Sequence, residues 1–178
     1  MSLAEVLEPA IDYAENGHPI EESVARSIER ARPRFEQFPT SAGVFLPGGV
    51  APQPGEMFRM TDLANTFKKV VEAEQQALQA GKTRSEALQA AFERFYSGDI
   101  AQEMAQLYQG NGGDCPLEDL ARYEPIWAEP VHTTFRGYDI YSSPSTSRGG
   151  FEVAMQLNLV EAFDLKALGH NSPETIHL

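Results

Sequence analysis

The spacing of the four histidines bears on whether the chain could bind a metal ion. They are His18, His132, His170 and His177. Two histidines that bind one ion from the same helix face stand four residues apart, and no pair here has that spacing. His132 falls in an alternating strand pattern, and the other three fall near predicted helix ends, where an imidazole often meets backbone carbonyls. The sequence therefore predicts no zinc site and no catalytic histidine.

Two residues are candidates for a nucleophile, Cys115 and Ser147. Cys115 is the only cysteine, which excludes an internal disulfide and a site built from several cysteines, and no base stands near it in the sequence. Ser147 lacks the Gly-x-Ser-x-Gly pattern that exposes a serine on a strained turn. We therefore predict no catalytic role for either residue. An independent hydrolase that uses Cys115 or Ser147 remains a rival hypothesis.

The run Ser145-Thr146-Ser147-Arg148-Gly149-Gly150 precedes a predicted helix, and both glycines and a helix start can bind anions. It lacks the full spacing of a phosphate loop, and we favour glycines that let the helix pack closely under a hairpin. The neighbouring carboxylates Glu21-Glu22 and Glu118-Asp119 suggest acid–base pairs. Both pairs fall at predicted helix starts, where an acid stabilises the positive end of the helix dipole. The sequence thus assigns no catalytic, substrate-binding or metal-binding residue.

The composition is that of an ordinary globular protein with an acidic surface. Hydrophobic residues make up 42% and charged residues 22% of the 178 residues, which allows the core of one domain. Fourteen Lys and Arg against 26 Asp and Glu give a formal net charge of −12. No stretch interleaves basic and aromatic residues, and no window has the ~18 apolar residues of a membrane span. Nucleic acid, membrane and cofactors are therefore not predicted as partners.

Apolar residues at helical spacing predict an α-rich first part, residues 1–123. The predicted helices run from Leu3 to the stop at Asn16-Gly17, from Glu21 to Pro33, from a capping Thr61 to Gly81, from the capping box Thr83-Arg84-Ser85-Glu86 through Phe95, over Ile100–Tyr108, and from Pro116 to Tyr123. After Pro33, Phe35 and Phe38 suggest one more apolar turn. The segment from Pro39 to Gly55 is rich in proline and glycine. That composition predicts an ordered loop or a short hairpin.

The hydrophobic period changes after residue 123. Val131–Phe135 and Tyr138–Ser142 are rich in β-branched and aromatic residues, and Arg136-Gly137 between them fits a tight turn. The pattern predicts a β hairpin within 126–143. Helical spacing returns in a predicted helix over 150–165.

The last residues carry a strong helix start. Ser172-Pro173-Glu174 supplies a capping serine, a proline at the first helical position and an acid on the positive end of the dipole. The few residues after it predict a truncated helix from 173 that continues in a longer protein. The predicted fold is α+β and predominantly helical, one segment over 1–178 that forms a helical lobe with a β hairpin.

Short strings with a common order extend over nearly the whole chain. They are Glu8-Pro9-Ala10-Ile11, Asp62-Leu63-Ala64-Asn65-Thr66, Phe95-Tyr96-Ser97-Gly98, Asn111-Gly112-Gly113, Glu118-Asp119-Leu120-Ala121, Arg136-Gly137-Tyr138, Gly149-Gly150 and Leu157-Asn158-Leu159. In this order they resemble the middle of the large subunit of γ-glutamyltransferases. Each string alone is common, but the shared order is specific to the family.

The resemblance implies part of the αββα fold of N-terminal nucleophile hydrolases. It also implies self-cleavage of a precursor, and a new N-terminal threonine that attacks a γ-glutamyl amide with its own α-amine as base. The threonine, the substrate-binding serines and the oxyanion glycines belong to the small subunit, and the substrate-binding arginine lies upstream, so none maps here. Gly149-Gly150 matches a large-subunit Pro-Pro-Pro-Ser-Ser-Gly-Gly motif instead. The implied partner is the rest of the parent chain with its small subunit, in the periplasm or outside the cell.

The chain also departs from the family. Pro144-Ser145-Thr146-Ser147-Arg148 replaces the triple proline and paired serines, and residues 76–91 look like an insertion. A divergent member with a substrate other than glutathione fits these differences, so acylase and amide-ligase relatives remain alternatives. A naturally short, non-catalytic binding module is a rival from another class. We predict that this chain alone is inactive and that apolar surface left by the missing parts favours self-association.

Overall fold

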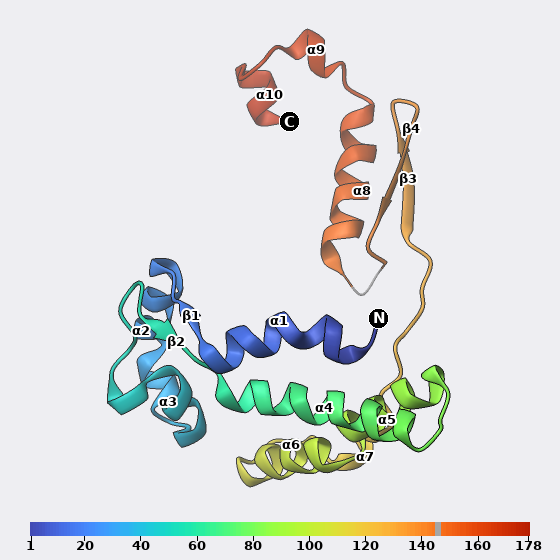
Figure 1. Ribbon diagram of the computed structural model, residues 1–178. Helices are drawn as coiled ribbons and strands as arrows, with labels where there is room; N and C mark the ends of the chain where they lie inside the picture. Colours follow the sequence, from blue (N-terminus) through green and yellow to red (C-terminus); the bar gives the residue numbers. More distant parts are fainter. Residues whose placement is uncertain (145–146) are drawn as a thin grey trace. The chain divides into compact units, whose positions relative to one another are not determined.

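The computed structural model describes residues 1–144 and 147–178 (Figure 1). The chain divides into two compact units, Met1–Tyr123 and Glu124–Leu178. Helices dominate, and the described strands form two small antiparallel sheets of two strands each. The predicted α+β, predominantly helical class is confirmed. None of the described helices combines the length and apolarity needed to cross a membrane.

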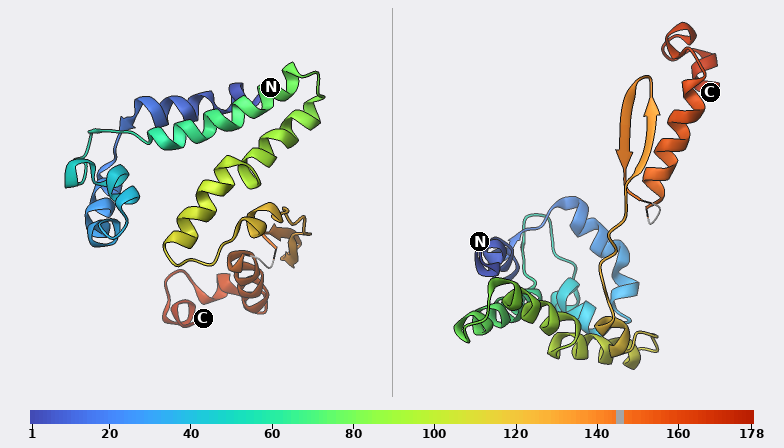
Figure 2. Two further views of the ribbon diagram at one scale, coloured as in Figure 1. Left: turned by 90° about the horizontal axis from the view of Figure 1, so that it is seen from below. Right: turned by 90° about the vertical axis from the view of Figure 1, so that its right-hand side faces the viewer.

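The first unit is a layered set of helices with one very short sheet. Its elements are α1 (Leu3–Asn16), β1 (His18–Pro19), α2 (Glu22–Phe35), α3 (Pro39–Phe45), the 3-10 turn η1 (Pro47–Gly49), β2 (Met57–Phe58), α4 (Thr61–Gln79), α5 (Arg84–Tyr96), α6 (Asp99–Gly110) and α7 (Leu117–Ala121). Strands β1 and β2 pair antiparallel, with His18 opposite Phe58. Helix α1 lies along α4, as Figure 1 and the left-hand view of Figure 2 show.

The segment from Pro39 to Gly55 is not the predicted loop or hairpin. Pro39 opens α3 at the first helical position, where its missing N–H costs no hydrogen bond. Pro47 then opens η1 in the same way, and Gly48 (φ 66°) turns the chain. The prediction was wrong because proline at a helix start favours a helix, whereas proline inside a helix disfavours one.

Helix α2 continues past Pro33 to Phe35, in agreement with the further apolar turn predicted there, but it ends before Phe38. Proline inside a helix removes one backbone hydrogen bond. The extra turn places the Phe35 ring on the Phe45 ring, with centroids 4.6 Å apart. Packing of Phe35 against the core offsets the lost hydrogen bond, and a pattern of residue types does not show that contact.

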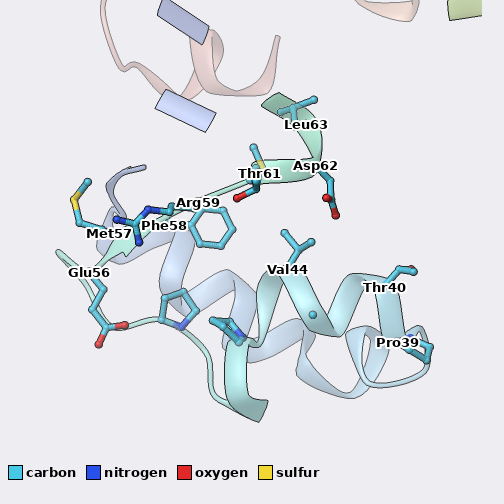
Figure 3. Close-up of a pocket in the computed structure, with 14 residues that line it drawn as sticks. Pro39, Thr40, Val44, Glu56, Met57, Phe58, Arg59, Thr61, Asp62 and Leu63 are labelled. Carbon is cyan, nitrogen blue, oxygen red and sulfur yellow. The ribbon is translucent and has the colours of Figure 1, made fainter. Parts of the chain in front are cut away.

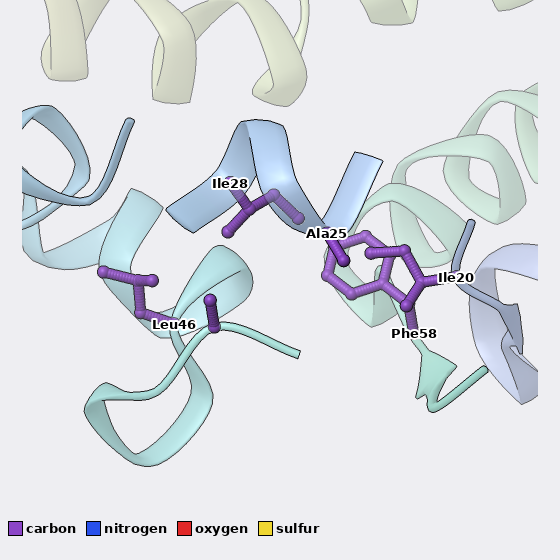
Figure 4. Packing of buried hydrophobic residues seen from close by; sticks show 6 residues of the cluster. Ile20, Ala25, Ile28, Leu46 and Phe58 are labelled. Atoms are coloured by element: carbon purple, nitrogen blue, oxygen red, sulfur yellow. The ribbon is translucent and has the colours of Figure 1, made fainter. Parts of the chain in front are cut away.

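The core of the first unit joins α2, the α3–η1 segment and β2 (Figure 4). Its buried residues are Ile20, Ala25, Ile28, Leu46, Ala51 and Phe58. The Phe45 ring stacks on Phe58 at 6.0 Å between centroids. The 39–55 segment therefore contributes Leu46 and Ala51 to this cluster.

Local side-chain chemistry sets some of the helix ends, and one predicted cap is absent. Thr83 and Glu86 form the predicted capping box, in which each side chain accepts a hydrogen bond from the other residue's backbone N–H. Gly81 (φ +80°) follows the end of α4, as predicted. Thr61 does not cap α4: the capping position is Met60, and no side chain caps that helix.

The second unit is a hairpin covered on one side by a helix. Its elements are β3 (Val131–Phe135), β4 (Tyr138–Ser142), α8 (Arg148–Glu161), α9 (Leu165–Leu168) and α10 (Pro173–His177). The hairpin strands match the prediction, and Arg136 (φ 50°) and Gly137 (φ 84°) form its turn. Helix α8 starts before and ends before the predicted 150–165. Ser172 caps α10 as predicted, by accepting a hydrogen bond from the Thr175 N–H.

Helix α8 approaches the hairpin at Gly150. A Cβ atom on Gly150 would lie 2.2 Å from the carbonyl oxygen of Ser143, whereas one on Gly149 would meet only the Ser147 hydroxyl at 3.8 Å. Further along, the Thr133 hydroxyl donates a hydrogen bond to Asn158 Oδ1 at 2.6 Å. Close packing of the helix under the hairpin is confirmed for Gly150 alone.

Candidate functional site

The four histidines do not lie together in the structure. His18 packs edge-on between Tyr13 and Phe58, with ring centroids at 6.4 and 6.2 Å. His170 and His177 are exposed. Over residues 1–144 and 147–178, no three or more His, Cys, Asp or Glu residues are grouped so that they could hold a metal ion.

The nearest approach to a catalytic pair lies on the outer face of the hairpin. His132 Nε2 is 2.8 Å from Asp139 Oδ1, and its ring stacks on Tyr141 at 4.7 Å. A carboxylate that orients an imidazole is two thirds of a triad, and the third group is a nucleophile bound to the other ring nitrogen. No such nucleophile contacts His132 among the described residues. Strand register reveals this pair, because Asp139 faces Thr134, two residues from His132 on the same hairpin face.

The two candidate nucleophiles lie in different units. Cys115 is partly exposed between α6 and α7, and Ser147 is exposed at the start of α8. No hydrogen bond joins either side chain to a histidine or a carboxylate in the part of the chain that the structure describes. Ser145 and Thr146 lie outside the described residues. Each nucleophile therefore lacks a base here.

The paired carboxylates sit at helix starts. Glu21 occupies the capping position of α2, and Glu22 forms an ion pair with Arg26 one turn later. Glu118 and Asp119 lie in the first turn of α7. Their positions agree with the helix-dipole interpretation of these acids.

A groove runs between α3, β2 and the start of α4 (Figure 3). Its volume is about 810 Å³, and its walls include Val44, Phe58 and Leu63, with Arg59 and Asp62 at the rim. Arg59 Nε donates a hydrogen bond to the Asn16 carbonyl at 3.2 Å. The groove could bind an apolar group, but its walls contain no nucleophile paired with a base. Sequence reasoning missed it because one wall is the unpredicted helix α3.

One buried carboxylate ties the start of α1 to α4 and α5. Glu74 is fully buried, and its Oε2 accepts a hydrogen bond from the Leu3 N–H at 2.8 Å. Its Oε1 forms an ion pair with the Arg84 guanidinium, and no further group among the described residues donates a hydrogen bond to that oxygen. Arg84 Nη2 also donates a hydrogen bond to the Met1 carbonyl at 2.8 Å. These contacts hold structural elements together and leave no free acid for chemistry.

A network of charges joins α4, α5 and α6. Arg94 Nε lies 3.1 Å from Asp99 Oδ1, Arg94 Nη1 lies 2.6 Å from Glu72 Oε2, and Lys69 Nζ lies 3.0 Å from Asp99 Oδ2 and 2.9 Å from Glu103 Oε1. Hydrogen bonds from Arg94 and then from Lys69 lower the pKa of Asp99 to about 2. Each acid of this network forms an ion pair with a basic side chain of the same network, so the network is a structural contact.

The pKa of Asp99 sets a pH window for stability. A carboxylate whose pKa is lower in the folded state than in the unfolded state stabilises the fold above the unfolded pKa, and this contribution is lost as the pH falls through the folded pKa. For Asp99 the loss falls between about pH 4 and pH 2. Asp99→Asn should lower the free energy of unfolding near neutral pH by about 0.5–1 kcal/mol, a small effect because the pair is partly exposed. Urea titrations should show that this difference disappears near pH 2; a difference unchanged between pH 7 and pH 2 would contradict it.

Comparison with known proteins identifies the family. The profile of the family described as gamma-glutamyltranspeptidase matches residues 1–178. The chain belongs to this family. Among curated γ-glutamyltranspeptidase relatives, the glutathione hydrolase-like YwrD proenzyme of Bacillus subtilis is 35% identical over all 178 residues, which are 30% of its own length. The acylase ACY 1 proenzyme of Pseudomonas sp. strain V22 is 30% identical over the same residues, 29% of its length.

A solved structure supports the same assignment. The γ-glutamyltranspeptidase of Helicobacter pylori superposes with a TM-score of 0.83 at 32% identity, and the match covers 99% of this chain and 46% of that one. The resemblance found in the sequence strings is therefore confirmed. The chain spans about a third of the length of these curated family members.

Proposed function

We propose that this chain is the structural part of a larger proenzyme that transfers or hydrolyses γ-glutamyl amides such as glutathione. The observation that carries the proposal is the family match over residues 1–178, together with relatives about three times as long. The reacting groups would come from the rest of that protein, including a small subunit with an N-terminal threonine. Both curated relatives are named as proenzymes, which supports cleavage of a precursor.

The contacts of the described residues support a framework role. An N-terminal nucleophile, its amine and its oxyanion donors must converge within about 3 Å of one reacting carbonyl. In this chain Asp99, whose pKa is lowered, is held by Arg94 and Lys69, and the buried Glu74 is held by Arg84 and Leu3. Side chains that hold each other in this way fix helices in place and do not take up protons from a substrate.

A second candidate activity is the hydrolysis of another acyl amide. It is favoured by the acylase ACY 1 relative, which matches the whole chain at 30% identity. A framework shared by both enzyme types does not select the acyl group, so the parts outside this chain would do so. A short, non-catalytic binding module remains the rival hypothesis. Under that hypothesis the protein encoded by the parent gene has no γ-glutamyl or acylase activity.

The test is an activity assay on this chain alone. We expect a γ-glutamyl anilide and a cephalosporin-type acyl amide to be hydrolysed no faster than in buffer. Cys115→Ala and Ser147→Ala should leave that result unchanged. Hydrolysis above the buffer rate that either substitution abolishes would establish an independent hydrolase and overturn the proposal.

A further inference from the structure

Two asparagines of the chain are followed directly by glycine, Asn16 and Asn111. An asparagine side chain loses ammonia when the backbone nitrogen of the next residue attacks its Cγ atom. Glycine in the next position favours this attack, because it has no side chain to obstruct the nitrogen and its backbone turns most freely. Both asparagines stand at the end of a helix, Asn16 as the last residue of α1 and Asn111 as the residue after α6. The sequence alone therefore does not distinguish them.

The contacts around Asn16 and Gly17 hold this part of the backbone in place. The Asn16 carbonyl oxygen accepts a hydrogen bond from Arg59 Nε at 3.2 Å, and its side-chain amide donates one to Asp12 Oδ1 at 2.6 Å. A Cβ atom on Gly17 would lie 2.9 Å from Arg59 Cγ and 3.0 Å from the Phe58 carbonyl oxygen, so this glycine is closely packed. Strand β1 begins at the next residue and pairs with β2. The rotation that brings the Gly17 nitrogen to Asn16 Cγ must disturb these contacts.

Asn111 and Gly112 are held by fewer contacts. Both residues are exposed, and a Cβ atom on Gly112 would have no atom of the described residues within 4 Å. The Asn111 side-chain amide donates a hydrogen bond to the Leu107 carbonyl at 2.7 Å. A bond of the same kind holds the Asn16 side chain, so the side-chain bonds do not distinguish the two positions. The difference lies in the backbone and in the packing of the glycine.

The turn that contains Gly112 is joined to the end of α6. The Gly112 N–H donates a hydrogen bond to the Gln109 carbonyl at 3.1 Å. The Gly113 N–H donates one to the Tyr108 carbonyl at 2.8 Å. Residues 111–116 form neither helix nor strand. Because these bonds reach only the last turn of one helix, local opening of that helix end is enough for the rotation, and such fraying costs little free energy.

We propose that Asn111 is a deamidation site of the folded chain, whereas Asn16 is protected, and that the product loosens the end of α6. The Gly112 nitrogen bonds to Asn111 Cγ, the side-chain nitrogen leaves as ammonia with the Gly112 proton, and a cyclic imide remains. Water then adds to either imide carbonyl and opens the ring to aspartate or isoaspartate. Either product places a new carboxylate at the negative end of the helix dipole and cannot donate the side-chain hydrogen bond to Leu107. The proposal does not depend on the proposed enzymatic activity.

Peptide mass mapping of the folded chain after prolonged incubation near neutral pH tests the site. The peptide with Asn111 should gain the mass of an amide-to-acid change about tenfold faster or more than the peptide with Asn16, because opening at Asn16 breaks more contacts. In guanidinium chloride both peptides should react at similar rates, since both asparagines precede glycine. Equal rates in the folded chain, or faster reaction at Asn16, would overturn the proposal.

Two variants test the reasons given for protection and for loosening. Arg59→Ala removes the hydrogen bond to the Asn16 carbonyl and the side chain beside Gly17, so deamidation of Asn16 should accelerate several-fold while that of Asn111 stays the same. Asn111→Asp reproduces one product and should speed amide hydrogen exchange in the last turn of α6, whereas Arg59→Ala should not. Circular dichroism confirms that both variants are folded. Unchanged reaction of Asn16 in the first variant would contradict the protection, and unchanged exchange in the second would contradict the loosening.

Discussion

Gly150→Ala is expected to lower the free energy of unfolding of the second unit by about 3 kcal/mol. The new Cβ would lie 2.2 Å from the carbonyl oxygen of Ser143, far inside van der Waals contact. Because that oxygen belongs to the backbone, it cannot rotate away, so α8 must separate from the hairpin. The gain in helix propensity, at most about 1 kcal/mol, does not offset the clash.

The neighbouring glycine provides the control for this substitution. A Cβ on Gly149 meets only the Ser147 hydroxyl at 3.8 Å, so Gly149→Ala should be neutral or stabilise the helix by up to about 1 kcal/mol. Amide hydrogen exchange of β3, β4 and α8 measures both effects in the unit where they arise. Equal protection factors in the two variants would contradict close packing at Gly150.

Arg84→Met is expected to cost about 3 kcal/mol of unfolding free energy, because it leaves the Glu74 carboxylate buried without its counter-ion. Solvent reaches Arg84, whose side chain is 46% exposed, but it does not reach Glu74. Removal of the arginine should therefore lower the free energy of unfolding more than removal of the glutamate. Urea unfolding followed by far-UV circular dichroism measures both.

A double variant separates the ion pair from the helix packing. Glu74→Met together with Arg84→Met removes both charges and keeps most of the volume, so it should be more stable than Arg84→Met alone. It still loses the hydrogen bond to the Leu3 N–H, worth about 1 kcal/mol. A double variant less stable than Arg84→Met would mean that the unpaired Glu74 carboxylate does not destabilise the fold, contrary to this interpretation.

Elements set by local chemistry were predicted well from the sequence. The Thr83–Glu86 capping box, the Arg136-Gly137 turn and the Ser172 cap each depend on residues within a few positions of one another. Helix α3 was not predicted. Its formation depends on Phe35, Phe45 and Phe58 meeting across the core, which no local pattern contains.

For the candidate site too, local features were predicted from the sequence and long-range contacts were not. The strings that resemble γ-glutamyltransferases identified the family, and the helix-start positions of Glu21 and Glu118 followed from capping rules. Long-range contacts were missed: the His132–Asp139 pair, the burial of Glu74 and the groove beside α3. Each of them brings together residues whose approach depends on strand register or helix packing.

Covalent labelling of the intact parent protein tests most directly whether the attacking group lies outside this chain. An electrophilic glutamine analogue should attach to the nucleophile, and peptide mass mapping should locate it beyond these 178 residues, on the N-terminal threonine of a small subunit. Stoichiometric, substrate-protected labelling of Cys115 or Ser147 would contradict the framework role proposed for this chain.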